Sequence, residues 1–143
     1  MSLEEFDAIF VKAQRQKPFR FKLESPSSLE EIEQLETLLG LSLPSQLKAF
    51  LRKYGAGYVG DINIFSASPS SEWYLPLGNR LLPPGIGFLA VSDDQTGGYF
   101  GFLTEAGRCE EGVCYFHLYD GDPPHLKTAT FFDYVAQFGV SWR

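Results

Sequence analysis

Apolar and polar positions alternate with a helical period over residues 29–39, where apolar side chains recur at intervals of three and four. Ser28 and Glu31 form a capping-box pattern in front of this run, and the Ser27–Glu30 pair offers an alternative register. Gly40 follows the last apolar position, where a residue that accepts a positive φ can end a helix at little cost. The pattern predicts a helix over residues 29–39.

A second amphipathic helix is predicted directly after Leu43-Pro44, because proline suits the first turn of a helix. One stripe of this segment is apolar and consists of Leu47, Phe50, Leu51 and Tyr54. Gly55 and Gly57 then end the helix and lead into the next segment. Two short helices cannot bury both of their apolar stripes against each other, so we expect them to pack on a larger structure.

The rest of the chain predicts one more helix at each end and a series of strands between them. Apolar spacing indicates a helix over residues 3–16, which Pro18 stops, and a closing helix over residues 130–137. Strand-like segments, bounded by turn residues, are 19–23, 58–65, 88–91, 99–103 and 113–119. The proline-rich stretch 66–87 is the longest irregular connection, and connections of this kind often carry binding residues.

This order of elements predicts an α+β fold in a single domain spanning residues 1–143. We expect a mainly antiparallel, twisted sheet of about 5–6 strands, with the N-terminal helices and the C-terminal helix packed on it. Trp142 is expected to be a packing residue at the terminus.

Three segments together resemble a known family. The first runs from Ile32-x-x-Leu35 through Leu39-Gly40 and Leu43-Pro44 to Phe50-Leu51 and Tyr54-Gly55, and the others are Asp93–Phe102 and Thr130–Val135. In this order they resemble the SUKH superfamily, and within it the branch related to the fungal Smi–Knr cell-wall regulators. The resemblance covers roughly residues 25–140. The chain departs from it at Tyr54-Gly55-Ala56-Gly57, where many members have Asn-Gly-Gly, and at Leu47, where an aromatic residue is frequent.

The net charge of −6 is unevenly distributed. Residues 1–56 hold eight basic and eight acidic side chains, whereas residues 57–143 hold four basic and ten acidic ones. The whole acidic excess therefore lies in the strand-rich part. Such a surface repels nucleic acid and can steer a basic protein partner, although acidic loops also serve simply to keep a protein soluble.

The sequence gives no strong sign of an enzyme, a cofactor or a metal site. Cys109, Cys114, His117 and His125 are soft ligands, but they lack paired spacing, and Cys114 and His117 are expected on opposite faces of a strand. Asp120-Gly121-Asp122 resembles the start of a calcium loop without the later ligands. No apolar run is long enough for a membrane span, and no secretion signal is evident, so we expect a cytoplasmic protein.

The resemblance implies a non-catalytic, protein-binding domain. Bacterial members of the superfamily often act as immunity proteins that bind a cognate toxin, frequently a nuclease; the fungal relatives suggest a regulatory or scaffolding module instead. The expected partner is thus a protein, for example a basic toxin domain, with no binding to nucleic acid or membrane and an open oligomeric state. Core packing at the edge of the sheet is expected for Tyr99, Tyr115 and Tyr119 on the predicted strands, whereas for Trp73 on the polar loop an interface role and a core role are equally expected. Trp73 is the best candidate for an interface anchor, and the candidate partner-binding residues are Asp61, Glu72, Trp73, Asp93, Asp94, Asp120 and Asp122.

Overall fold

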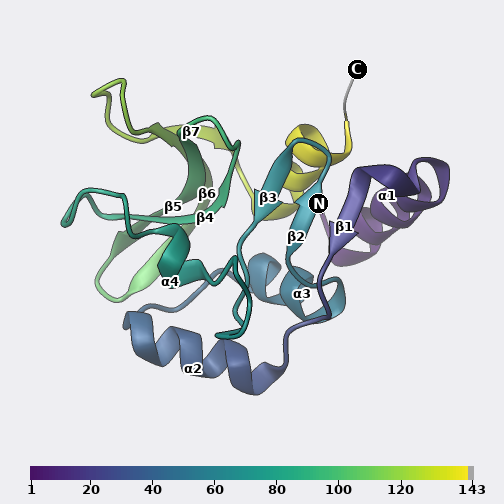
Figure 1. Ribbon diagram of the computed structural model, residues 1–143, viewed down its shortest axis with the longest axis horizontal. Coiled ribbons are helices and arrows are strands. Elements are labelled where there is room, and N and C mark those ends of the chain that lie inside the picture. Colours follow the sequence, from purple (N-terminus) through teal and green to yellow (C-terminus); the bar gives the residue numbers. More distant parts are fainter. Residues whose placement is uncertain (142–143) are drawn as a thin grey trace.

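The computed structural model describes residues 1–141 and shows one seven-stranded antiparallel sheet with strands in sequence order (Figure 1). Each strand pairs with its neighbours along the chain. The strands are β1 (Phe21–Leu23), β2 (Gly57–Val59), β3 (Ile62–Ile64), β4 (Phe88–Asp93), β5 (Gly98–Glu105), β6 (Arg108–His117) and β7 (His125–Thr128). The expected packing role of Trp142 falls outside the described residues.

The helices largely follow the sequence predictions. Their bounds are α1 (Leu3–Gln16), the short 3₁₀ turn η1 (Pro18–Arg20), α2 (Leu29–Leu39), α3 (Ser45–Lys53), α4 (Leu75–Gly78), α5 (Phe131–Tyr134) and its π-helical continuation η2 (Val135–Val140). The predicted capping box of α2 is confirmed: the Ser28 hydroxyl accepts the N–H of Glu31, and the Glu31 carboxylate accepts the N–H of Ser28. Gly40 ends α2 with φ of 65°.

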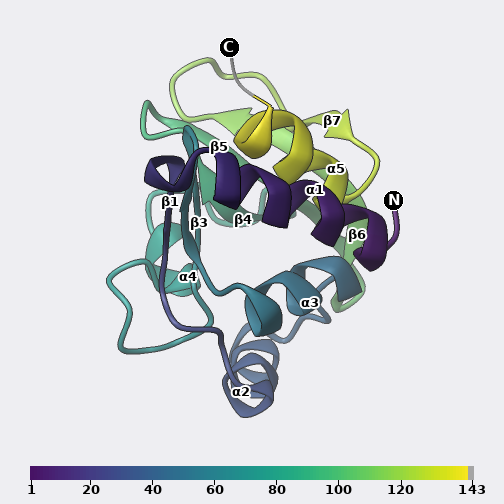
Figure 2. The ribbon, with the colours of Figure 1, turned by 90° about the vertical axis from the view of Figure 1, so that its right-hand side faces the viewer.

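An aromatic core fills the space between the helices and one face of the sheet. Phe6 of α1 stacks on Phe132 with ring centroids 4.5 Å apart, and Phe10 packs edge-on against Phe50 of α3 at 5.4 Å. The fully buried Tyr134 of α5 donates its hydroxyl hydrogen to Ser92 of β4. Stacked and edge-on pairs of this kind each add about 0.5–1.5 kcal/mol beyond the burial of their area. In Figure 2, α1 and α5 lie side by side across this face.

The predicted number of strands was too small for two reasons. The segment 58–65 is not one strand but the β2–β3 hairpin, in which Gly60 and Asp61 form a two-residue turn between the paired Val59 and Ile62. A glycine with positive φ followed by a turn-forming residue is a hairpin signal. The second reason is β7, which was missed because its first three residues are exposed, so that no apolar alternation marks it. A smaller correction concerns Phe19 and Arg20, which belong to η1 and not to β1.

No helix within residues 1–141 combines the length and the apolar character needed to cross a membrane.

Candidate functional site

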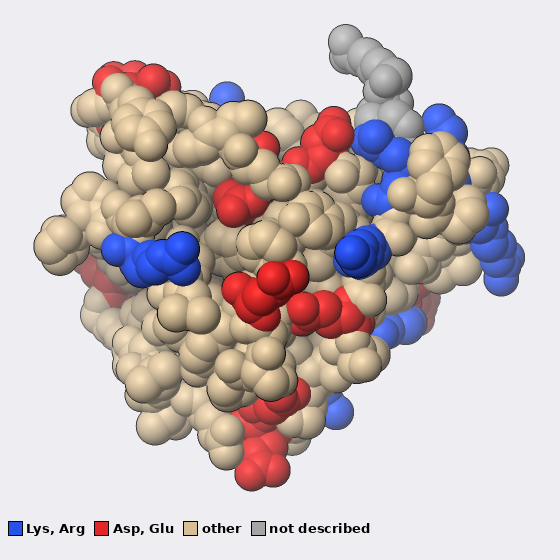
Figure 3. Space-filling model, viewed as in Figure 1, with Lys and Arg blue, Asp and Glu red and all other residues tan. Residues whose placement is uncertain are grey.

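Five acidic residues from the candidate set lie at one end of the sheet. Because the strands follow sequence order, alternate connections fall at the same end, and the β2–β3, β4–β5 and β6–β7 connections are spread along that end (Figure 1). We call this group the acidic edge; it consists of Asp61, Asp93, Asp94, Asp120 and Asp122. In Figure 3, Asp and Glu side chains lie at the upper left, in the centre and at the bottom of this face, whereas most Lys and Arg gather at the right over α1, with a further basic group at the left of the centre.

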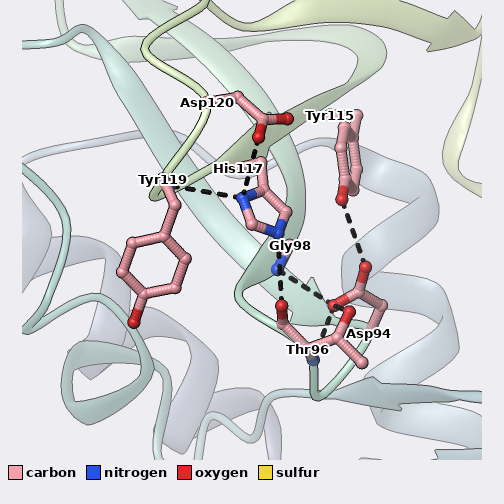
Figure 4. Close-up of polar contacts among 7 residues, drawn as sticks. All are labelled: Asp94, Thr96, Gly98, Tyr115, His117, Tyr119 and Asp120. Atoms are coloured by element: carbon pink, nitrogen blue, oxygen red, sulfur yellow. Dashed lines mark hydrogen bonds and ion pairs between the residues drawn. The ribbon is translucent and has the colours of Figure 1, made fainter.

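Asp94 organises the β4–β5 turn. One carboxylate oxygen accepts the N–H of Thr96 at 2.9 Å, the Thr96 hydroxyl at 2.8 Å and the N–H of Gly98 at 2.9 Å (Figure 4). The other oxygen accepts the hydroxyl of Tyr115 on β6 at 3.2 Å. Partial burial acts to raise the pKa of Asp94, but these hydrogen bonds outweigh it and hold the pKa below its ordinary value. The charge of Asp94 is therefore directed into the turn more than toward solvent.

His117 joins this turn to the β6–β7 loop. Its Nδ1 accepts the N–H of Tyr119 at 3.2 Å, which assigns the ring proton to Nε2, and Nε2 lies 3.2 Å from the Thr96 carbonyl oxygen. Asp120 Oδ1 lies 3.6 Å from Nδ1 (Figure 4). The connection places Asp94 and Asp120 on neighbouring segments and leaves Tyr119 projecting outward, 82% exposed.

The linking residues Tyr115, His117 and Tyr119 were not among the candidate partner-binding residues. A role in core packing was expected for Tyr119, and that expectation is wrong, since the residue lies beyond the end of β6. Tyr99 on β5, by contrast, is buried as expected. The alternating polar and aromatic residues of 113–119 signalled a half-exposed strand, but they gave no sign of which residues would reach the neighbouring turn.

Beside the acidic edge, the long connection between β3 and β4 folds over the sheet and encloses a cavity of about 160 Å³. Two predicted residues, Glu72 and Trp73, line it together with Asp93 at the end of β4. The other lining residues are Phe65, Leu77, Gly78, Arg80, Leu81 and Tyr99. Three of the seven candidates thus meet at one hollow, although Glu72 and Asp93 are far apart in the sequence.

The wall of the cavity is fixed by Asn79, at the end of α4. Its side-chain amide accepts the N–H of Ala90 at 2.8 Å and donates to the Ala90 carbonyl at 2.8 Å. It therefore makes the two hydrogen bonds that the backbone of a neighbouring strand would make. This occurs where the β4–β5 register shifts between Ala90 and Ser92. Gly78 lies so close to the Phe65 ring that a β-carbon there would overlap it. Glycine is therefore required for α4 to approach the sheet at this point.

The Trp73 side chain is half-buried and packs edge-on against Tyr58 of β2, with ring centroids 5.8 Å apart. The sequence left interface and core as equal roles for Trp73, and the structure gives it features of both, since it contacts the sheet and lines the open hollow.

Unlike Asp94, Asp93 has few hydrogen bonds to stabilise its charge. Its Oδ1 atom is buried and has no hydrogen-bond partner within residues 1–141. Burial, and secondarily the negative charge of Asp94, raise the pKa of Asp93 to about 6, against a smaller opposing effect of the Gln95 N–H. A carboxyl group in this state is a feature typical of functional sites.

The remaining candidates are exposed. Asp61 lies 3.6 Å from an Arg20 guanidinium nitrogen and is 82% exposed. Asp122 is exposed in the β6–β7 loop. Within the described part of the chain, no three His, Cys, Asp or Glu side chains are grouped so that they could hold a metal ion, and Cys109 and Cys114 are not disulfide-bonded.

Comparison with known families gives one match. Residues 29–135 match the sequence profile of the family described as SMI1-KNR4 cell-wall (SUKH_6). The match begins with α2, extends into η2 and includes both the acidic edge and the cavity. It confirms the family that the sequence motifs indicated. The comparison with curated proteins found no match.

Proposed function

The chain belongs to the SMI1-KNR4 cell-wall family (SUKH_6), and from this premise we propose that it is a non-catalytic protein-binding domain of the immunity type. Its partner would be a toxin domain with a basic, nuclease-type groove, which the acidic edge and the adjoining cavity would cover.

The observation that carries this proposal is the combination of anchors and charges on one surface. Tyr119, Leu77 and Leu81 are 82%, 47% and 62% exposed, and Trp73 is half-buried beside the last two. Glu72, Asp93 and Asp120 lie beside these groups, with one basic residue, Arg80, among them. Binding energy in protein interfaces concentrates on such aromatic and aliphatic anchors, while the charged surroundings set specificity and association rate.

The sign of the charge favours a basic partner. A nuclease groove is positively charged because it must hold phosphates, and a carboxylate-rich surface can compete for the same groups. The basic residues of α1 gather at the right of the same view, and Arg20 of η1 lies 3.6 Å from Asp61 at the border of the acidic edge (Figure 3). Acidic groups outnumber basic ones on this surface, and this excess favours steering of a basic partner.

A regulatory or scaffolding role in cell-wall or growth control is the second candidate, and the family description favours it by naming the cell wall. The two functions differ in binding behaviour. An inhibitor binds one partner tightly and stoichiometrically, with an association rate that falls as salt rises. A scaffold binds several partners more weakly.

The first experiment is affinity capture of the tagged protein from its own cells at low and high salt, with mass spectrometry of the retained proteins. One stoichiometric partner whose nuclease activity is blocked by an equimolar amount of this protein is the expected result. Several weakly held wall or growth proteins would instead favour the regulatory candidate and overturn the immunity proposal.

A charge-reversal variant then tests the surface itself. Glu72, Asp120 and Asp122 are exposed and are changed together to Lys, whereas Asp94 is kept because its hydrogen bonds hold the turn. We expect the association rate with the captured partner to fall about tenfold or more at low salt. The matched control reverses Glu105, Glu110 and Glu111, which are also exposed but belong to the β5–β6 hairpin at the other end of the sheet. Equal effects of the two triple variants would refute the proposed surface.

A further inference from the structure

Cross-strand register places four polar or aromatic side chains in one row beneath the β3–β4 connection. Tyr58 pairs with Asn63, Asn63 with Asp93, and Asp93 with Tyr99. Directly opposite residues in an antiparallel sheet point to the same face, with β-carbons about 4.5–5.5 Å apart. Trp73 contacts Tyr58 at one end of the row and lines the cavity with Asp93 and Tyr99 at the other. Asn63 is not itself one of the residues that line the cavity, but it lies next to Asp93 in this row, buried directly beneath the lining residues.

Asn63 is an unusual residue for such a position. It is fully buried, yet neither Oδ1 nor Nδ2 has a hydrogen-bond partner in the part of the chain that the structure describes. Asp93 Oδ1 is in the same state. Buried polar atoms without partners are rare in folded proteins, and each requires an explanation such as a ligand. Here two neighbouring side chains together leave acceptor atoms unused at one site.

The walls of the cavity suit a planar cation. Trp73 and Tyr99 contribute aromatic surfaces, and Leu77 and Leu81 add apolar contacts. The charged and titratable groups that face Asp93 are Glu72, Asp94, Arg80 and Tyr99. Cations bind favourably over aromatic rings, most of all when water is excluded, and carboxylates strengthen this attraction.

We propose that this cavity is a subsite for one arginine side chain of the protein partner, with the guanidinium group donating to Asp93 and Asn63 while it packs against Trp73. The subsite rests on the function proposed above, because the arginine is one presented by the bound protein. Guanidinium offers five donors in a rigid plane and is less strongly hydrated than an ammonium group. It can therefore satisfy two acceptors in a partly dry aromatic site where lysine would remain hydrated.

The chain's own Arg80 does not fill this role. It lines the cavity, but its guanidinium group donates to the Leu77 carbonyl oxygen at 3.4 Å, and among residues 1–141 it forms no ion pair with Asp93 or Glu72. Its side chain is exposed. Arg80 lies at the rim of the cavity, where its positive charge repels an arginine that enters. Arg80→Gln is therefore expected to strengthen binding of the arginine.

The subsite is tested on the whole protein with small probes, without the partner. N-acetyl-arginine amide is titrated while the indole N–H of Trp73 and the side-chain amide of Asn63 are followed by NMR; Trp73→Phe assigns the indole signal, since the chain has only one other tryptophan, Trp142. The matching citrulline amide has nearly the same shape without the charge, and the lysine amide has the charge without the plane.

We expect saturable shifts of both signals with the arginine amide, binding at least tenfold weaker with the citrulline and lysine amides, and a loss of at least tenfold in the Asp93→Asn variant. Glu105→Gln, exposed in the β5–β6 hairpin at the other end of the sheet, serves as the control that leaves arginine binding unchanged. Absence of shifts, equal shifts with citrulline, or unchanged binding in Asp93→Asn would overturn the subsite.

The result is independent of partner capture. A captured nuclease-type partner together with no arginine binding would leave the proposed function standing and remove the subsite. Arginine binding that matches the expected pattern, with only wall or growth proteins captured, would support the subsite and overturn the immunity function.

Discussion

Replacing Asp93 by asparagine is expected to make the protein more stable while it weakens partner binding. The side chains are nearly equal in size, so the change removes a charge and little else. A rise in the pKa of a carboxyl group from about 3.9 to about 6 corresponds to a free-energy penalty of about 3 kcal/mol for the ionised form. Because Asp93 is only partly buried, solvent screening reduces this to about 1–2 kcal/mol. The melting temperature should rise by roughly 3–8 °C at pH 7.5.

The pH dependence follows from the direction of the shift. The pKa of Asp93 is higher in the folded than in the unfolded protein, so between about pH 4 and pH 6 the folded state holds more of this proton. The contribution of Asp93 to stability is fully present below about pH 4 and is lost as the pH rises through 6. Asp94 acts in the opposite direction, since its pKa is lowered, but it is present in both proteins and largely cancels in their difference.

Urea denaturation of the two proteins from pH 3.5 to pH 7.5 measures this difference. The two free energies of unfolding should nearly coincide at pH 3.5, diverge up to about pH 6 and stay apart above it. Asp122→Asn is the control, for which no change above about 0.5 kcal/mol is expected because the residue is exposed. A variant that is no more stable than the parent at pH 7.5, or a gain that is the same at every pH, would refute the reasoning.

Three further substitutions test the scaffold and the surface. Asn79→Ala removes both hydrogen bonds to Ala90 and should lower the free energy of unfolding by about 2–4 kcal/mol in urea titrations; a loss below 1 kcal/mol would contradict its role as a strand substitute. Gly98→Ala introduces a β-carbon that overlaps Asp94 and should cost about 1–3 kcal/mol, with faster amide exchange in the β4–β5 turn; unchanged exchange would count against the network. Tyr119→Ala should leave stability within about 0.5 kcal/mol but weaken partner binding more than tenfold in calorimetry, and unchanged affinity would remove Tyr119 from the interface.

The helices were predictable because their signals are local. The capping box of α2 requires only Ser28 and Glu31, three residues apart, and Gly40 needs nothing beyond its own freedom at positive φ. The antiparallel sheet was predictable as a class from turn residues and apolar alternation. Strand β7 was not, because it is an edge strand whose first three residues are exposed.

The candidate site was predictable in its residue types but not in its assembly. With 58–65 read as one strand, Asp61 could not be recognised as a turn residue at the same sheet end as Asp93. The pairing of Asn63 with Asp93 depends on register between strands separated by the long connection, and no local pattern encodes it. The missing partners of Asn63 arise only from packing.

The order of the strands also has a consequence for folding kinetics. Strands β4 to β7 are joined by short connections, so their hairpins close over small distances along the chain and carry a low entropic cost of loop closure. Pairing of β3 with β4 must instead close the whole connection from Phe65 to Gly87. The cavity can form only after β3 has paired with β4, because Trp73 belongs to the connection between them and Tyr99 belongs to β5. We therefore expect the proposed recognition surface to be among the last parts of the protein to form during folding, and among the first to open in the native state.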